Sequence, residues 1–173
     1  MPGTGPPAMG PAAQAQAICL RLLTARPRSR AELAEALRRR GIPTEVGEPV
    51  LTRLSEVGLV DDAAFAETAV YSGHRYRGLG RRALRSELHR KGVAREVVDE
   101  AVAGLRPEDE EQQARSLVRR KLRSGTMTDA SAQARKLSGM LARKGYSEGL
   151  ALRVVREELG LPDWSIEIEP RPD

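Results

Sequence analysis

Hydrophobic residues return along this chain at the three- and four-residue intervals that are typical of amphipathic helices. The clearest case is a phrase that occurs three times, as LRRRGI, LHRKGV and LARKGY. Each copy has a leucine, two adjacent cations, a glycine and an apolar residue, and a second leucine stands four residues before the first. The glycines are Gly41, Gly92 and Gly145, so the copies are 51 and 53 residues apart. This regular spacing predicts an internal repeat.

The glycine of each phrase predicts the end of a helix. A left-handed residue after a helix is least strained without a Cβ, and the two preceding cations favour the negative end of the helix dipole. Apolar positions return five, nine and ten residues after each glycine, which predicts a second helix. A further helix precedes each pair. Helix starts are marked by Ser29 with Glu32, which can form a capping box, by Asp61 and Asp62, and by Pro107.

These elements predict an all-α fold of three tandem three-helix repeats, stacked into an elongated array because one such unit buries too little alone. The first residues are rich in Pro, Gly and Ala, which predicts a disordered leader. Only WSIEIE, near the C-terminus, alternates apolar and polar residues as a strand does. The predicted divisions are a leader over 1–13, repeats over 14–60, 61–106 and 107–160, and a short tail over 161–173.

Composition narrows the function. The chain has 173 residues, a formal net charge of +5 and 29 Lys and Arg residues, most of them arginine. This balance favours nucleic acid or an acidic protein surface as partner, although a genome rich in arginine codons explains it equally well. Cys19 is the one cysteine, which excludes an intramolecular disulfide, and its apolar neighbours predict burial. Without a membrane-length apolar run or a secretory signal, we expect a cytoplasmic protein that does not bind membranes.

The residues offer no catalytic set. His74 and His89 stand among arginines without a second metal ligand at helical spacing. The RGLGR segment lacks the preceding strand and the ending of a nucleotide-binding loop. Asp61 and Asp62 are more simply explained as helix caps than as an acid–base pair. We therefore predict a protein that is not an enzyme and that has no cofactor and no metal site.

A basic segment is the strongest binding signal. Between Arg75 and Arg95, eight cations face one acid, Glu87. Arg81 and Arg85 are four residues apart, so a cationic face forms opposite the leucine stripe, and its arginines should be replaceable without loss of helicity. Aromatic residues are too scarce for extensive base stacking. The predicted partner-binding residues are Arg75, Arg77, Arg81, Arg82, Arg85, Arg90, Lys91 and Arg95.

Two segments, VGLVDDAAFAETAV and RYRGLGRRALRSELHRKGV, resemble the central block of the RecX proteins, bacterial regulators of the RecA recombinase. The resemblance extends from about Ala17 to Gly160. It implies a curved all-helical body that binds in the groove of the RecA filament on DNA. It also implies inhibition of filament growth, ATP hydrolysis, strand exchange and coprotease function, and hence a role in homologous recombination, DNA repair and the SOS response. We expect a monomer that binds single- or double-stranded DNA weakly.

The motif residues Asp61, Asp62, Phe65, Gly41, Gly92 and Gly145 are expected to have structural roles. Phe65 is the one phenylalanine, and we expect it in the core because Ala69 lies on the same helical face. We expect its replacement by alanine to cost roughly 3–5 kcal/mol.

Two other functions are compatible with parts of the chain. Residues 29–60 resemble a helix-turn-helix DNA binder, with a recognition helix from Thr44 to Val57. That helix has Arg53 as its one cation among three acids, which is a poor match to a major groove. A protein that binds DNA by charge alone is the third possibility, and it requires no protein partner.

Overall fold

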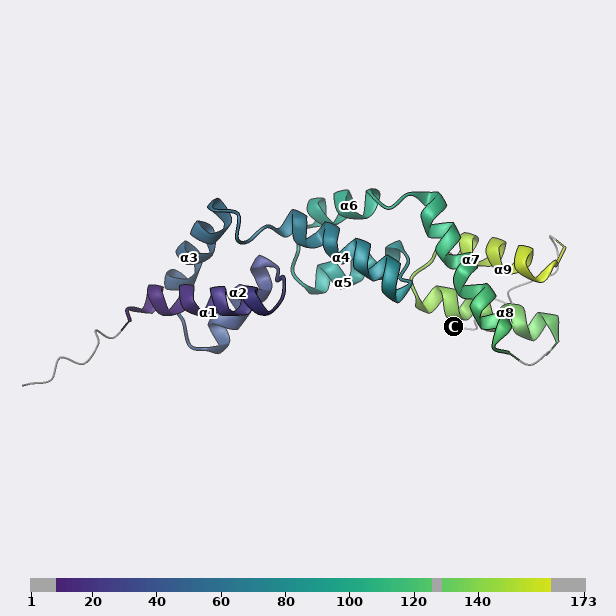
Figure 1. Ribbon diagram of the computed structural model, residues 1–173, viewed down its shortest axis with the longest axis horizontal. Helices are drawn as coiled ribbons and strands as arrows, with labels where there is room; N and C mark the ends of the chain where they lie inside the picture. The colour runs from purple at the N-terminus through teal and green to yellow at the C-terminus, as the bar shows by residue number, and fades with distance from the viewer. Residues whose placement is uncertain (1–8, 126–128, 163–173) are drawn as a thin grey trace, which may run out of the picture. The chain divides into compact units, whose positions relative to one another are not determined.

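The structure is a computed structural model that describes residues 9–125 and 129–162, and all regular secondary structure in these ranges is α-helical (Figure 1). The helices follow one another in triplets, as the sequence pattern predicts. Their bounds are α1 Pro11–Ala25, α2 Arg30–Arg39, α3 Thr44–Glu56, α4 Asp62–Arg77, α5 Arg81–Arg90, α6 Arg95–Ala103, α7 Pro107–Arg123, α8 Ala130–Arg143 and α9 Glu148–Leu159. The predicted all-α fold is confirmed for this part of the chain.

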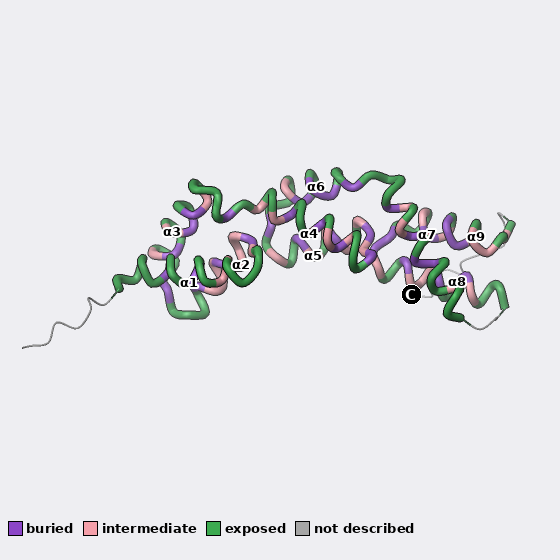
Figure 2. The backbone as a smooth tube through the Cα atoms, viewed as in Figure 1, coloured by how far each residue is buried: buried purple, intermediate pink, exposed green. Residues whose placement is uncertain are grey.

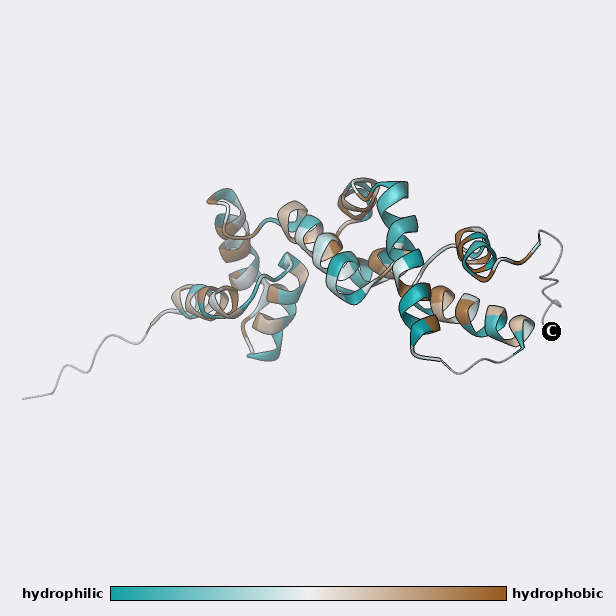
Figure 3. Ribbon diagram, turned by 45° about the vertical axis from the view of Figure 1, so that its right-hand side comes forward, coloured by the Kyte–Doolittle hydropathy of each residue, from teal (hydrophilic) through white to brown (hydrophobic). Residues whose placement is uncertain are grey.

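Amphipathic periodicity explains why these segments are helices. Buried and exposed positions alternate along the helices (Figure 2), and hydrophobic and hydrophilic residues alternate in the same way (Figure 3). Local signals define where several of them begin. Ser29 Oγ accepts the Glu32 N–H at 3.1 Å while a Glu32 carboxylate oxygen accepts the Ser29 N–H at 3.1 Å, which confirms the capping box. Asp61 accepts the Ala64 N–H at 3.0 Å and caps α4.

The repeated phrase ends the middle helix of each triplet. Gly41, Gly92 and Gly145 have φ values of 75°, 71° and 88°, which confirms the left-handed conformation. The apolar residue that follows each glycine is buried, and its N–H returns to the carbonyl of the leucine four residues before the glycine. These bonds are Ile42 to Leu37 at 3.1 Å, Val93 to Leu88 at 3.2 Å and Tyr146 to Leu141 at 3.1 Å. The leucine, the glycine and the apolar residue of the phrase are therefore one helix-terminating motif.

The helices form two compact units, each described by itself. The first unit contains the residues up to Ala66 and Leu88–Val98, and the second contains Glu67–Glu87 and the residues from Asp99 onward. In the first unit, the core is built by α1, α2 and α3 around side chains such as Leu33 and Leu51, which have no exposed surface. The repeat boundaries given above remain predictions, since each unit combines one terminal triplet with part of the middle one.

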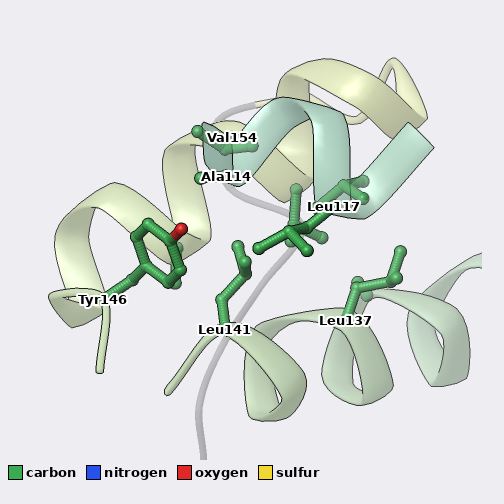
Figure 4. Packing of buried hydrophobic residues seen from close by; sticks show 10 residues of the cluster. Ala114, Leu117, Leu137, Leu141, Tyr146 and Val154 are labelled. Carbon is green, nitrogen blue, oxygen red and sulfur yellow. The ribbon is translucent and has the colours of Figure 1, made fainter. Parts of the chain in front are cut away.

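The core of the second unit lies between α7, α8 and α9. Leu117, Leu137, Leu141 and Val154 converge there, and Tyr146 packs on the same cluster (Figure 4). These are the apolar positions of the predicted stripes, so the hydrophobic pattern of the third triplet faces the core as expected.

The expected disordered leader, residues 1–13, is shorter in the structure. Most of the predicted leader lies outside the described residues, but α1 already begins at Pro11. Residues 11–13 are therefore helical, because proline is favourable in a first helical turn and the next two residues are alanines, strong helix formers. The strand-like WSIEIE also lies outside the described residues.

The expectation that Phe65 belongs to the core is corrected. Phe65 is only half-buried, whereas Ala66 and Val70 are buried on α4. The inward face of this alanine-rich helix is thus rotated by one residue from the face predicted. The Lys91 ammonium lies over the Phe65 ring, 5.8 Å from its centroid, which is a cation–π distance.

Candidate partner-binding surface

The RGLGR segment takes part in a contact between two turns of the second unit, and we call such a contact between turns of successive repeats a joint. The turn between α4 and α5 meets the turn between α8 and α9, and the Gly80 N–H donates to the Lys144 carbonyl at 2.8 Å. The Arg82 N–H donates to the Gly145 carbonyl at 3.1 Å, and the buried Tyr146 hydroxyl donates to the Gly78 carbonyl at 3.0 Å. Burial and the negative charge of Glu110 raise the pKa of Tyr146, which keeps this hydroxyl protonated as a donor.

Close packing also requires glycine at positions 80 and 145 of this joint, in addition to the positive φ of Gly145. A Cβ on Gly80 would lie 2.7 Å from the carbonyl carbon of Gly145, and a Cβ on Gly145 would overlap the backbone nitrogen of Ala83. The two turns therefore approach backbone to backbone. Sequence reasoning did not identify this contact between the two turns.

The first unit contains the equivalent joint one repeat earlier. Ser29, just before α2, donates through its hydroxyl to the Lys91 carbonyl at 2.5 Å. A Cβ on Gly92 would overlap the Cβ of Ala31, whereas a Cβ on Gly41 would meet no atom within 4 Å. The lysine–glycine turn of the second and third phrases thus holds the start of the middle helix of the preceding repeat. The first phrase makes no such approach.

A carboxylate strengthens each joint. The Arg30 N–H at the start of α2 donates to Asp62 Oδ1 at 2.8 Å, and the Arg81 N–H at the start of α5 donates to Glu110 Oε1 at 2.9 Å. In both cases the carboxylate comes from the first helix of the next repeat and caps a free helical N–H. The structural role expected for Asp62 is therefore explained by a contact between repeats.

Three predicted partner-binding residues have partners within the second unit. Arg77 makes two bonds to Glu87, at 2.8 and 3.1 Å, and Arg85 Nε lies 3.1 Å from Asp99. Arg81 donates to the Leu105 carbonyl, and its Nε lies 3.3 Å from the buried Glu110. We infer that these side chains tie neighbouring helices together. The expectation that these arginines can be replaced without loss of helicity stays a prediction, and the contacts indicate that such replacement removes links between helices at Arg77, Arg81 and Arg85.

Arg75 and Arg82 differ from these three arginines in their surroundings. Both are exposed, and neither guanidinium has a carboxylate partner among the described residues. Arg82 lines a hollow of about 400 Å³, the Arg82 hollow, together with Arg135. The hollow is also lined by Tyr146, Leu152 and the acid Glu148, so two cations, a carboxylate and apolar side chains adjoin there.

The other three predicted residues lie in the first unit. Arg90 and Arg95 are exposed, and Lys91 lies 3.4 Å from Glu32. Burial acts to raise the pKa of Glu32, but hydrogen bonds from Arg26 and the Ser29 N–H, with the charge of Lys91, outweigh it and lower that pKa. Lys91 therefore faces a carboxylate that remains charged at neutral pH.

A basic hollow of about 510 Å³ opens beside these residues in the first unit. Glu32 and Glu35 are its acids, and the pKa of Glu35 is lowered to about 2 by hydrogen bonds from Arg38 and Arg39. Sequence reasoning missed the cations between α1 and α2 and those at the end of α2, although the paired cations before Gly41 were a visible signal. The cations that line this basic hollow are Arg26, Arg28, Arg39, Arg40, Arg90 and Lys91.

Two negative observations apply to the described residues only. No group of three or more His, Cys, Asp or Glu side chains is placed to hold a metal ion in that part of the chain. None of the helices between residues 9 and 162 has the length and apolar character needed to cross a bilayer.

Known proteins resemble the chain along most of its length. Models of the first, second and third three-helix domains of RecX match residues 15–54, 61–102 and 108–155. The regulatory protein RecX of Streptomyces coelicolor is 57% identical over 155 residues, covering 90% of this chain and 82% of the relative. The regulatory protein RecX of Thermobifida fusca is 58% identical over 147 residues, covering 85% and 80%.

Solved structures agree with the fold. A crystal structure of RecX from Lactobacillus salivarius superposes with a TM-score of 0.75 at 17% identity, covering 85% of this chain and 96% of that one. A second crystal structure, of regulatory protein RecX, has a TM-score of 0.76 at 25% identity and covers 87% and 73%. The first likeness is a likeness of fold alone.

Proposed function

The chain belongs to the RecX family of regulatory proteins, and from this premise we propose that it inhibits the RecA recombinase. It binds in the helical groove of the RecA–DNA filament and limits filament growth, ATP hydrolysis and strand exchange. It acts in the cytoplasm, as a monomer and without a catalytic step of its own. The observation that carries this proposal is the match of all three family domains, in order, along residues 15–155.

The joints explain how such a protein presents its contacts. Within each unit, a terminal helix triplet is held to part of the middle triplet by a turn contact and a capped helix start, so cations on both sides of that joint keep a fixed spacing. A preorganised surface loses less conformational entropy when it binds a repetitive partner. We assign the first contacts with the filament to Arg75 and Arg82 of the second unit and to the basic hollow of the first unit.

Arginine suits either component of a nucleoprotein filament. Its guanidinium forms two-pronged hydrogen bonds with carboxylates and with phosphates. Arg75 and Arg82 lack a carboxylate partner in the described part of the chain, so binding does not require them to break an ion pair. Arg77, Arg81 and Arg85 contribute positive charge while they hold the helices in place.

A helix-turn-helix function is disfavoured by α3. Its single cation, Arg53, lies 3.3 Å from Glu56, and Glu45 and Glu48 add negative charge to the same helix. Such a helix is repelled by DNA phosphates. Binding to DNA by charge alone is favoured by the basic hollow, and we assign it a weak, secondary role beside the filament contact.

The test is a titration of RecA ATP hydrolysis on single-stranded DNA with this protein. Inhibition at fewer copies of the protein than of RecA supports the proposal. No inhibition at equimolar protein contradicts it, and inhibition only when the protein saturates free DNA favours the charge-driven alternative.

Matched double variants sharpen this titration. Arg75→Ala with Arg82→Ala removes the two arginines without carboxylate partners, and we expect weaker inhibition. Arg53→Ala with Arg106→Ala removes the same charge from exposed surface pairs, at 75% and 71% side-chain exposure, and should inhibit like the parent. Equal inhibition by both double variants would remove Arg75 and Arg82 from the contact.

A further inference from the structure

Two of the three tyrosines of this chain are exposed on one helix. Tyr71 is 62% exposed and Tyr76 is 76% exposed, both in the second half of α4. Their ring centroids lie 6.3 Å apart with an angle of 87° between the planes, so the edge of one ring meets the face of the other. The third tyrosine, Tyr146, is buried in the joint. The exposed pair therefore has no comparable role in holding the fold together.

An apolar hollow begins at Tyr71. It measures about 420 Å³ and lies between α4, α6 and α7 within the second unit. Val70, Ala101 and Leu105, each at most 8% exposed, contribute to its walls. We call it the Tyr71 hollow. It offers a desolvated place for an apolar side chain, with a tyrosine at its edge.

Charges on the rim restrict what can bind. Arg75 lines the hollow and has no carboxylate partner among the described residues, while Glu67 and Asp109 line it as acids. A bound surface with a carboxylate opposite Arg75 gains an ion pair, and the same carboxylate is repelled beside Glu67 or Asp109. The mixed rim thus selects one orientation.

These features favour a protein over a nucleic acid at this hollow. Bases stack on successive open aromatic faces, whereas here the two rings are perpendicular and the edge of one meets the other. The two rim carboxylates also repel phosphates. Tyrosine and arginine beside an apolar hollow are the residue types that dominate binding energy in protein interfaces.

We propose that Tyr71, Tyr76 and the Tyr71 hollow are the hydrophobic anchor of the contact with RecA. The hollow receives an apolar side chain of the recombinase that has a carboxylate next to it, and Arg75 pairs with that carboxylate. This inference rests on the proposed function and identifies the surface that distinguishes the protein component of the filament from its DNA.

The test compares two matched double variants for binding to RecA filaments preassembled on single-stranded DNA. Tyr71→Ala with Tyr76→Ala should bind about tenfold more weakly than the parent, since interface tyrosines are frequent hot spots. Val57→Ala with Leu59→Ala removes apolar side chains of 52% and 51% exposure from the first unit and should bind like the parent. Circular dichroism should be unchanged in both.

A second variant addresses the hollow itself. Gln112 is exposed on its rim, so Gln112→Trp places a large side chain across the opening without changing the core. We expect the same loss of filament binding with both tyrosines present. Full filament binding by the double tyrosine variant would overturn the proposal, and full binding by Gln112→Trp would overturn the role of the hollow.

Binding to naked single-stranded DNA separates the remaining outcomes. The proposal predicts that the tyrosine variant binds naked DNA like the parent. An equal loss of filament and naked-DNA binding would show that the rings contact nucleic acid, and it would overturn the anchor. A parent protein that neither binds nor inhibits the filament would overturn the proposed function as well, whereas a fully active tyrosine variant would overturn the anchor alone.

Discussion

The Gly80 N–H donates a 2.8 Å hydrogen bond to the main-chain carbonyl of Lys144, 64 residues further along the chain. The hydroxyl of Ser29 makes the corresponding bond to the carbonyl of Lys91. In both joints the residue just before a middle helix contacts the lysine just before a helix-ending glycine of the next repeat. The recurrence of lysine and glycine in the second and third phrases therefore coincides with a joint between repeats as well as a helix end.

Alanine at Gly145 should destabilise the protein more than alanine at Gly41. Both positions have positive φ, which costs on the order of 1 kcal/mol for a residue with a Cβ. Only Gly145 also faces a backbone, at Ala83, so Gly145→Ala should cost roughly 2–4 kcal/mol in total. Urea unfolding of the two variants measures the difference. Equal losses would contradict the close approach at the joint.

Arg81 and Arg82 are neighbours in sequence, but their replacement by alanine should change the free energy of unfolding by different amounts. Arg81→Ala leaves the buried Glu110 without its cation and should cost about 1–3 kcal/mol. Arg82→Ala removes an exposed side chain and should change stability by no more than about 0.5 kcal/mol. Thermal unfolding of the single variants decides this. If Arg81→Ala melts like the parent, its role in the joint is refuted.

Phe65→Ala should cost about 1–2 kcal/mol, less than expected for a core phenylalanine, because the ring is half-buried. Leu84, on α5, is 2% exposed, and Leu84→Ala should cost roughly 2–5 kcal/mol. Parallel urea titrations of both variants test the order. A larger loss for Phe65 than for Leu84 would restore the assignment to the core.

Acid should weaken the third repeat. A hydrogen bond from Arg119 lowers the pKa of Glu158, with Arg115 adding to this effect against partial desolvation, and a hydrogen bond from Arg115 likewise lowers the pKa of Glu111. A carboxyl whose pKa is lower in the folded than in the unfolded protein stabilises the fold. This stabilisation is complete when the pH is above the unfolded pKa of about 4.3. That stabilisation is lost as the pH falls through the lower, folded pKa.

The acid effect can be measured by urea unfolding between neutral pH and pH about 3. The parent should lose stability over this range more steeply than Glu158→Gln, in which the titrating carboxyl is absent. Identical pH profiles would show that Glu158 does not contribute through its ionisation.

The local features of this fold were predictable from the sequence. The capping box at Ser29 and the left-handed glycines depend on residues within one turn of a helix end, so a short window contains the necessary information. Cys19 was also correctly predicted as buried, from its apolar neighbours. Burial raises the pKa of its thiol, consistent with an unreactive core residue.

Features that depend on how helices meet were not predictable. The Arg77–Glu87 and Arg85–Asp99 pairs join residues ten and fourteen positions apart, and their formation depends on how separate helices are placed. The joints depend on which turns meet, which no single repeat encodes. The inward face of α4 was missed by one residue because alanine on several sides gives a weak hydrophobic stripe.

Salt dependence tests most directly whether the regulated partner is the RecA filament rather than DNA. One experiment measures, over the same salt series, the affinity for naked single-stranded DNA and the inhibition of RecA ATP hydrolysis. DNA affinity should fall with a log–log slope of about −0.7 per neutralised phosphate, while inhibition persists at moderate salt because part of the contact is with protein. Parallel loss of both activities would contradict docking on the filament and support competition for DNA.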